Sequence, residues 1–432
     1  MKIGLVTAFP PSGRQLNEYG LHLARELVKE SVVSLTIIGD ELDVLDFATD
    51  AHGKPIDPES LKELPEYNVV RTWKFGAVDN PLRILRAVRK LDPDVVWFNL
   101  VFSTFATQKN PIAAFIGLCT PALIRLAGYE THITLHHLME NVDFEAAGIS
   151  NLKEKLFRFA SFFATKMLLL ANSLTVLLPG YRRTLLDRYK ASNIHLRAHG
   201  ILGPSPVPPD FSKRGNPDQR ILAIGHWGTY KRLETLLEAF TEVQTRVPEA
   251  RLLIGGANHH TTPRYWEDLA EKYKDNDRIN FLGYVAEDDI PELFATSSIL
   301  VMPYDSATGS SGPAHQACQY GVPIVCADIH DFREMAENEE MMIEFYPRGD
   351  AKALEEKLVD VLRSPEKQQL MAERNFSAAL RQTMPAVIQN YLRYFARKRK
   401  REMVLQMNKL RRSSVARTAA LRRAGRAWAA WM

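Results

Sequence analysis

The chain has 432 residues, more than one ordinary domain core accommodates, so we expect two domains of about 200 residues each. Hydrophobic residues make up 46% and charged residues 25%, a balance typical of soluble globular proteins, so the fold class has to come from pattern. The formal net charge of +4 is uneven, because residues 393–432 hold 13 Lys or Arg and one acid, Glu402, which leaves about −8 for the first 392 residues.

The cysteines and apolar stretches argue against a secreted or membrane-spanning chain. Cys119, Cys318 and Cys326 have no paired spacing, so neither a disulfide framework nor a zinc site is predicted, and a cytoplasmic location is expected. The first residues lack the apolar segment and the cleavage site of a signal peptide. The longest apolar stretches, at 112–128 and 156–178, contain charged residues, so we predict no membrane span.

Short β-branched runs alternate with stretches of helical period through most of the chain. This alternation is typical of parallel sheets whose strands are joined by helical crossovers. We expect strands at 3–8, 33–38, 94–98, 132–135 and 174–178 in the first half, and at 221–225, 251–255, 279–282, 299–303 and 323–327 in the second. The chain is therefore predicted to form two doubly wound, Rossmann-like α/β domains.

A proline-rich stretch at 203–209 separates the two series, because neither a helix nor a central strand can continue through it. We expect helices after the last strand at 351–363, 368–381 and 384–396. The predicted organisation is an N-terminal domain at 1–203, a linker at 204–219, a C-terminal domain at 220–383, a helix at 384–396 that returns to the first domain, and a basic tail at 397–432.

In parallel sheets of this kind, ligands bind beyond the carboxyl ends of the strands, where loops meet helix N-termini. In the first domain this loop is 9–14, where Gly13 lets a ligand approach the backbone, although an ordinary turn explains the same residues. In the second domain it is 225–232, where glycines and the cations Lys231 and Arg232 suit a diphosphate. The alternative there is a surface loop with solvated cations.

The segment 304–325 favours the diphosphate interpretation. It has the pattern of a strand end, a loop rich in hydroxyls and glycine, a helix from about Pro313, a glycine C-cap at Gly321 and a new strand. The loop at 309–312 would direct backbone N–H groups and the helix dipole at a bound phosphate.

Together these segments resemble the donor domain of glycosyltransferase family 4. The resemblance covers roughly residues 1–390, is strongest from 221 to 337, and rests on Lys231, Gly255-Gly256, Phe281-Leu282-Gly283-Tyr284-Val285, Pro303, Pro313, Ala317 and Gly321-Val322-Pro323-Ile324-Val325. It implies a GT-B fold with two Rossmann-like domains facing a central cleft, an NDP-sugar donor, retention of anomeric configuration, and neither a cofactor nor a metal.

The first domain is similar to the family in two places. The loop at 10–13 resembles the family's glycine loop, with Arg14 where a second glycine is usual. Thr134-Leu135-His136 resembles a Thr-x-His after an inner strand, which implies that His136 lies beside the reacting sugar. The alternatives are that His136 is a strand-end histidine bonded to backbone, or that His137 takes the role.

The chain departs from the family at three donor-site positions. Two glutamates eight positions apart align with Thr308 and Gln316; Gln316 can still hydrogen-bond a ribose, whereas Thr308 offers no carboxylate. The family's arginine ahead of the lysine is His226, and Arg232 is the candidate to restore its charge. A divergent active site and a site that binds without turnover both fit, and the retention of Lys231 with the 309–312 loop and His136 favours activity.

We therefore predict a retaining glycosyltransferase of the hexosyltransferase class, which moves a sugar from an NDP-sugar to a hydroxyl of a glycan or lipid-linked acceptor in polysaccharide or glycoconjugate biosynthesis. The predicted catalytic residues are His136 and Lys231. The predicted donor-binding residues are Gly13, His226, Lys231, Arg232, Tyr284, Val285, Thr308, Gly309, Ser310, Ser311, Gly312 and Gln316. The alternatives are a non-catalytic nucleotide-sugar-binding subunit of a glycan-assembly complex and, less favoured without a GxGxxG loop, a Rossmann oxidoreductase.

Two segments suit an anionic membrane surface. The stretch 152–170 mixes basic and phenylalanine side chains, which fits a membrane-surface helix and equally a core-facing helix with a basic edge. The tail combines 397–401, a run of five cations, with Trp428 and Trp431, which predicts peripheral contact with the inner face of the membrane. The alternatives are a disordered solubilising tail and nucleic-acid binding, which lacks a recognition module.

Overall fold

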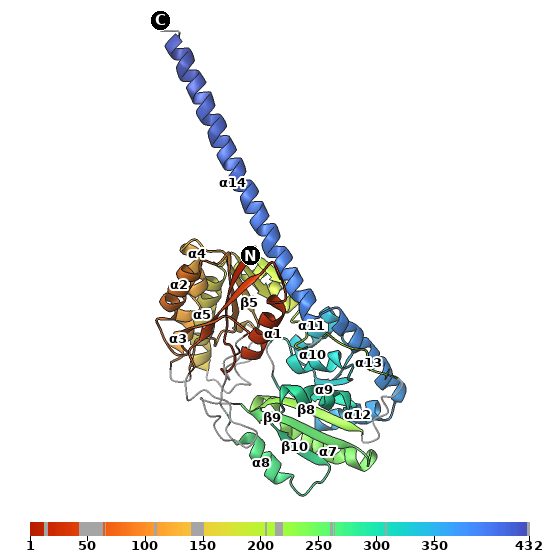
Figure 1. The fold of residues 1–432 in the computed structure, drawn as a ribbon. Helices are drawn as coiled ribbons and strands as arrows, with labels where there is room; N and C mark the ends of the chain where they lie inside the picture. Colours follow the sequence, from red (N-terminus) through yellow and green to blue (C-terminus); the bar gives the residue numbers. More distant parts are fainter. Residues whose placement is uncertain are drawn as a thin grey trace. The chain divides into compact units, whose positions relative to one another are not determined.

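The computed structural model describes residues 1–12, 16–42, 64, 66–107, 110–139, 151–203, 205–211, 219–259, 262, 264–306 and 309–429. Among these, Met1–Met384 form one compact unit that contains two parallel β-sheets. The described strands make a seven-stranded sheet in the order β3-β2-β1-β4-β5-β6-β7 and a six-stranded sheet in the order β10-β9-β8-β11-β12-β13 (Figure 1).

The strands and helices follow one another in the alternation that the sequence predicts. The first sheet contains β1 (Lys2–Val6), β2 (Ser34–Asp40), β3 (Val69–Trp73), β4 (Val95–Leu100), β5 (Thr131–Leu135), β6 (Ser173–Val176) and β7 (Ile194–Leu196). Its helices are α1 (Asn17–Leu27), α2 (Asn80–Leu91), α3 (Ile112–Gly117), α4 (Thr120–Leu126), α5 (Asn151–Leu168) and α6 (Pro179–Tyr189).

The second sheet contains β8 (Arg220–Trp227), β9 (Arg251–Asn258), β10 (Ile279–Gly283), β11 (Ile299–Met302), β12 (Ile324–Ala327) and β13 (Ile343–Tyr346). Its helices are α7 (Leu233–Arg246), α8 (Tyr265–Lys272), α9 (Ile290–Ala295), α10 (Gly312–Gln319), α11 (His330–Glu339), α12 (Ala351–Leu362) and α13 (Pro365–Leu380), with 3₁₀ turns η5 (Thr229–Lys231) and η6 (Glu287–Asp289).

The inner strands are the core of each sheet. β4, β5 and β6 in the first sheet and β11 and β12 in the second are buried at every residue. Strands of parallel sheets are buried in this way because helices cover both faces. The strand order reverses between β1 and β4 and between β8 and β11, and doubly wound sheets bind ligands beyond the carboxyl ends of the strands at such a point.

The predicted doubly wound α/β class is confirmed, and every strand predicted from sequence lies in one of the two sheets. The prediction misses β3, β7 and β13. All three are edge strands, and only one residue in each is fully buried, so their sequences lack the continuous apolar run of a central strand. Because 1–384 form a single compact unit, the linker placed at 204–219 stays a prediction.

The described part of the second compact unit, which runs from Pro385, is a single helix, α14 (Met384–Ala429). The helix predicted from 384 therefore begins at the expected residue but does not end at 396. Ala, Arg, Leu, Lys and Met, which are strong helix formers, dominate the stretch beyond 396, and no proline follows Pro385. Across the described residues, no helix is both long and apolar enough to cross a bilayer.

Candidate active site

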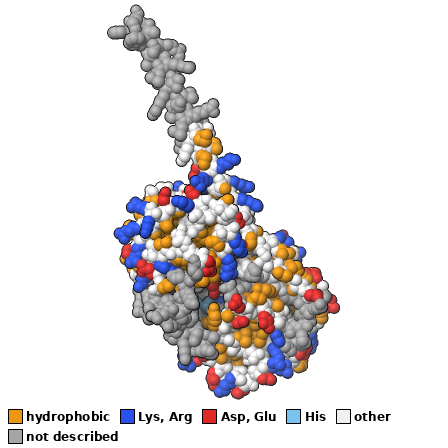
Figure 2. Space-filling view, viewed as in Figure 1, with side chains coloured by type: hydrophobic (Ala, Val, Ile, Leu, Met, Phe, Trp, Pro, Cys, Tyr) orange, Lys and Arg blue, Asp and Glu red, His pale blue; other side chains and the backbone are white. Residues whose placement is uncertain are grey.

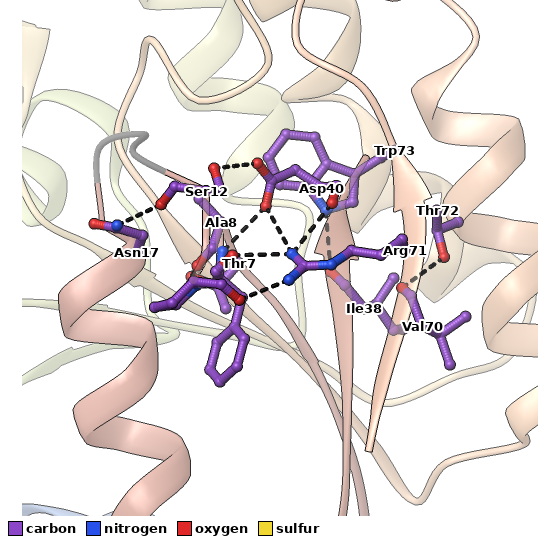
Figure 3. Close-up of polar contacts among 12 residues, drawn as sticks. Thr7, Ala8, Ser12, Asn17, Ile38, Asp40, Val70, Arg71, Thr72 and Trp73 are labelled. Atoms are coloured by element: carbon purple, nitrogen blue, oxygen red, sulfur yellow. Dashed lines mark hydrogen bonds and ion pairs between the residues drawn. The ribbon is translucent and has the colours of Figure 1, made fainter. Parts of the chain in front are cut away.

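The loop that follows β1 is held in shape by charged groups from β2 and β3 (Figure 3). The Asp40 carboxylate accepts hydrogen bonds from the Phe9 N–H at 3.0 Å and from the Ser12 hydroxyl at 2.5 Å. The Arg71 guanidinium donates to the carbonyls of Phe9 at 2.9 Å and Pro10 at 2.6 Å, and lies 3.6 Å from Asp40. Burial raises the pKa of Asp40, and the hydrogen bonds from Ser12 and Phe9 oppose that rise.

This clamp determines the path of the chain as it enters the predicted glycine loop. Gly13 itself lies outside the described residues. Sequence reasoning missed Asp40 and Arg71, although a carboxylate directly after the apolar residues at the end of β2 was a usable signal. A buried acid at a strand end needs hydrogen-bond donors, and the nearest available ones are on the neighbouring loop.

His136 directly follows β5 and is buried, with 8% of its surface exposed. Its Nε2 lies 2.7 Å from the Asn99 Oδ1, and its ring packs edge-on against Tyr19 with ring centroids 4.4 Å apart. Burial, with a smaller contribution from His137, lowers the pKa of His136 to about 3, and burial lowers that of His137 to about 4. Both imidazoles are therefore neutral at physiological pH.

Lys231 follows β8 and its ammonium is enclosed by aromatic rings. The Lys231 Nζ lies 4.6 Å from the centroid of Tyr304, and a Cβ added to Gly225 would lie 2.7 Å from it, so the glycine makes room for the lysine. Desolvation lowers the pKa of Lys231 to about 8. In the part of the chain that the structure describes, no carboxylate pairs with this ammonium. A desolvated cation without a counter-ion is suited to bind an anion.

Arg232 differs from its neighbour. Its guanidinium is exposed and forms an ion pair with Asp305 at 2.9 Å. Arg232 is predicted to supply a second cation to the donor. Asp305 competes with the donor for this cation, because the ion pair already neutralises the charge of Arg232. His226, at the end of β8, is exposed.

The 309–312 loop lies against the end of β5. Gly309 has a φ of 83°, and a Cβ there would come within 2.5 Å of the His136 carbonyl oxygen. This contact brings together the two predicted halves of the site, which are far apart in sequence. The approach requires glycine, because any other residue would meet backbone and would be strained at this φ.

The Gly309 N–H already has two acceptors within the chain, which compete with the phosphate role predicted for it, and that role stays a prediction. It donates to the Tyr181 hydroxyl at 2.7 Å and to the Asp331 carboxylate at 3.0 Å, and the Tyr181 hydroxyl donates to the same carboxylate at 2.5 Å. Sequence reasoning missed Tyr181 and Asp331, since no local pattern links residues 181, 309 and 331.

The start of α10 is open to a ligand. Ser311 caps the helix, with its Oγ accepting from the Ala314 N–H at 3.3 Å, while the Ser310 hydroxyl contacts the Met335 sulfur at 3.5 Å. No described atom lies within 4 Å of the point where a Cβ on Gly312 would be. Pro313 has no N–H and the Ala314 N–H is bonded to Ser311, so the Gly312 N–H and the positive helix end are what suit an anion at the start of α10. Gln316 is half-buried on the same helix.

The remaining predicted residues add little to this geometry. Tyr284 is 52% exposed beyond β10, and Val285 is half-buried against Gly255. Thr308 lies outside the described residues. Among the described residues, no group of three or more His, Cys, Asp or Glu side chains is placed to hold a metal ion.

Comparisons with known proteins assign the second half to a family. Residues 209–377 match the family described as "Glycosyl transferases group 1", so this segment is a glycosyl transferase group 1 domain. The chain is 33% identical over 90 residues to mannosylfructose-phosphate synthase of Agrobacterium fabrum, which covers 19% of each chain. It is 31% identical over 123 residues to O-antigen chain mannosyltransferase B of Escherichia coli, which covers 26% of this chain and 30% of that protein. These matches span less than a third of either relative.

The whole fold is similar to that of solved structures. HepE from Anabaena, in complex with UDP and glucose, matches with a TM-score of 0.62 and 15% identity, over 92% of this chain and 99% of that one. At this identity the likeness is one of fold. It confirms the GT-B fold, with two Rossmann-like parts, that the resemblance to glycosyltransferase family 4 implies.

Proposed function

Because a group 1 glycosyl transferase domain occupies 209–377 of a GT-B fold, we propose that this protein is a retaining glycosyltransferase that uses an NDP-sugar donor. The observation on which this rests most is the enclosed Lys231 ammonium, which has no carboxylate partner among the described residues and lies at the carboxyl end of β8. A diphosphate is the chemical complement of such a group.

In the proposed reaction, Lys231 stabilises the negative charge that develops on the leaving diphosphate as the glycosidic bond breaks. In this proposal the start of α10 contributes the Gly312 N–H and a positive helix end. His136 faces the donor sugar. The acceptor hydroxyl attacks the anomeric carbon from the side of the leaving group and gives its proton to an oxygen of the departing diphosphate, which retains the anomeric configuration. Neither a metal ion nor a cofactor takes part.

The identity of the donor is also part of the proposal. HepE is solved with UDP and glucose, and the two relatives are named mannosylfructose-phosphate synthase and mannosyltransferase, so a UDP-hexose or an NDP-mannose is the expected donor. The acceptor is a hydroxyl of a glycan or a lipid-linked glycan, as the name of the O-antigen chain enzyme suggests, in polysaccharide or glycoconjugate biosynthesis. Cytoplasmic donor pools and peripheral attachment at the inner face of the membrane fit this role.

A non-catalytic nucleotide-sugar-binding subunit is the second candidate. The replacement of two family glutamates by Thr308 and Gln316 favours it, and so do the pairing of Arg232 with Asp305 and the engaged N–H of Gly309. Each of these features leaves fewer groups for catalysis, while Lys231 remains to bind the diphosphate of an NDP-sugar.

Turnover separates the two candidates. Purified protein incubated with UDP-glucose, UDP-galactose, UDP-N-acetylglucosamine and GDP-mannose should release NDP slowly from one of them. The Lys231→Ala variant should lose this release, whereas Lys272→Ala should keep it, because Lys272 also lies over a tyrosine ring but is exposed on α8. Binding of an NDP-sugar without consumption in the presence of any acceptor would favour the binding subunit.

A further inference from the structure

A chain of buried hydrogen bonds runs from β1 to His136. The Thr7 hydroxyl donates to the Ala8 carbonyl at 2.9 Å, the Asn99 amide nitrogen donates to the Thr7 Oγ1 at 3.0 Å, and the Asn99 Oδ1 lies 2.7 Å from the His136 Nε2. Thr7 and Asn99 are completely buried. The three residues follow β1, lie in β4 and follow β5, strands that are neighbours in the sheet.

Thr7, the first residue in this series of hydrogen bonds, determines the direction of the other bonds. A hydroxyl has one hydrogen, and Thr7 uses it on the Ala8 carbonyl, so toward Asn99 the Thr7 oxygen can only accept. The Asn99 amide must therefore turn its NH₂ group to Thr7 and its oxygen to His136. An amide oxygen only accepts, so the His136 Nε2 must bear the proton.

Protonation at Nε2 determines what the other ring nitrogen can do. Burial lowers the pKa of His136 to about 3, so the ring is neutral and holds one proton. Nδ1 is then a hydrogen-bond acceptor, and no described residue donates to it. His132, four residues before His136 and within β5, differs: its Nδ1 lies 2.7 Å from the Ser173 Oγ and its Nε2 lies 3.3 Å from the Thr175 Oγ1.

We propose that Thr7 and Asn99 are positioning residues that hold His136 in the Nε2-protonated form, so that Nδ1 accepts a hydrogen bond from a hydroxyl of the donor sugar. The sugar contact rests on the proposed function, whereas the ring form does not. Packing also holds the first member in place, because a Cβ on Gly20 of α1 would lie 2.8 Å from the Thr7 Oγ1. Thr7 and Asn99 touch no substrate and act only through His136.

The ring form can be measured on the full-length chain without any ligand. Two-bond ¹H–¹⁵N spectra of ¹⁵N-histidine-labelled protein distinguish the two neutral forms, and His136→Asn assigns the signal by its loss. We expect the wild type and Thr7→Ser to show Nε2–H at His136. Thr7→Val is close in shape but offers Asn99 no acceptor, so the amide can turn and the Nδ1–H form should appear. An Nδ1–H ring in the wild type, or an unchanged ring in a folded Thr7→Val, would overturn the proposal.

The sugar contact is tested by comparing the affinity for a nucleotide sugar with the affinity for the nucleotide alone. The pair is UDP-glucose and UDP or, once turnover has identified the donor, that donor and its NDP. Thr7→Val should weaken binding of the nucleotide sugar about fivefold while leaving NDP affinity unchanged, and Thr7→Ser should restore it. Thr175→Val is the matched control, because it removes a hydroxyl from His132 instead. Equal weakening of sugar and NDP binding would refute the contact. A wild type that binds neither would contradict the proposed function, leaving the spectra to decide the ring form.

Discussion

Lys231 and Arg232 are adjacent in the chain and have the same charge, yet their surroundings differ. Lys231 lies among Trp227, Tyr230 and Tyr304, where its ammonium is desolvated and no described carboxylate compensates the charge. Arg232 turns outward to Asp305. Because a desolvated ammonium loses its proton more readily, burial lowers the pKa of Lys231 to about 8.

This difference predicts a pH dependence of binding. UDP affinity should fall as the pH rises through about 8, because ligand-free Lys231 then loses the proton that attracts the diphosphate. Below that pH the ammonium is charged and affinity should be constant with respect to this group. Isothermal titration calorimetry from pH 6.5 to 9.5 measures the effect.

Lys231→Arg is the control for this measurement, since its guanidinium stays charged throughout the range. It should bind UDP with affinity that is flat across the same pH values. A decline of equal size in Lys231→Arg would assign the titration to another group and contradict the prediction.

Helix α6 follows a strand of the first sheet and helix α11 follows a strand of the second, and polar contacts join the two helices. The Gly180 N–H donates to the Glu334 carboxylate at 2.8 Å, and Arg183 forms an ion pair with the same side chain. One residue along, the Tyr181 hydroxyl links Asp331 to the Gly309 N–H. The start of α6 therefore fixes the glycine loop that lies beside His136.

This arrangement predicts the effect of removing one oxygen atom. Tyr181→Phe should lower the free energy of unfolding by about 1–2 kcal/mol, because Asp331 loses a donor in a buried place. Chemical denaturation with urea measures the change. Tyr273→Phe is the control, because it removes the hydroxyl of the residue that follows α8, for which no described hydrogen bond exists. It should change the free energy of unfolding by less than about 0.5 kcal/mol. Equal stability of Tyr181→Phe and wild type would contradict the inferred contact.

At the scale of the whole molecule, charge is divided between a mildly acidic body and a basic C-terminal helix. Within the described side chains of α14, basic residues at 397–401 adjoin exposed Met403, Val404, Leu405 and Met407 (Figure 2). Cations next to exposed apolar side chains suit an anionic lipid surface. This supports the proposal of peripheral membrane attachment.

Deletion of 397–432 tests that proposal. It removes twelve Lys or Arg and one acid, which changes the formal net charge from +4 to −7. We expect the deleted chain to lose sedimentation with vesicles containing phosphatidylserine, since each cation near such a surface contributes about 1 kcal/mol. UDP binding should be unchanged, because Lys231 and α10 lie in the other compact unit.

The matched variant is a full-length chain with Gln in place of Arg411, Arg412, Arg422 and Arg423. It should bind vesicles more weakly, while the length of the tail and its helix-forming composition are kept. Binding of the wild type should also weaken with salt. If the full-length chain and the deletion sediment equally with these vesicles, the tail has no such role.

The sequence by itself determined the alternation of strands and helices and the doubly wound class, and it singled out the two segments after β8 and β11 that we propose for phosphate binding. These features depend on short-range pattern: apolar runs that are buried on both faces, and glycine and hydroxyl residues before a helix. The edge strands β3, β7 and β13 were not predicted, because a half-buried strand has no such apolar run.

Only the tertiary structure decided which polar groups meet. Asp40 and Arg71 clamp the loop after β1 from the next two strands of the sheet, Tyr181 of α6 bonds to Gly309, and Asp305 pairs with the charge of Arg232. None of these pairs is close in sequence, and a hydrogen bond or an ion pair depends on distance in space. The chemical role of a charged residue such as Lys231 is therefore set by the partners that folding provides or withholds.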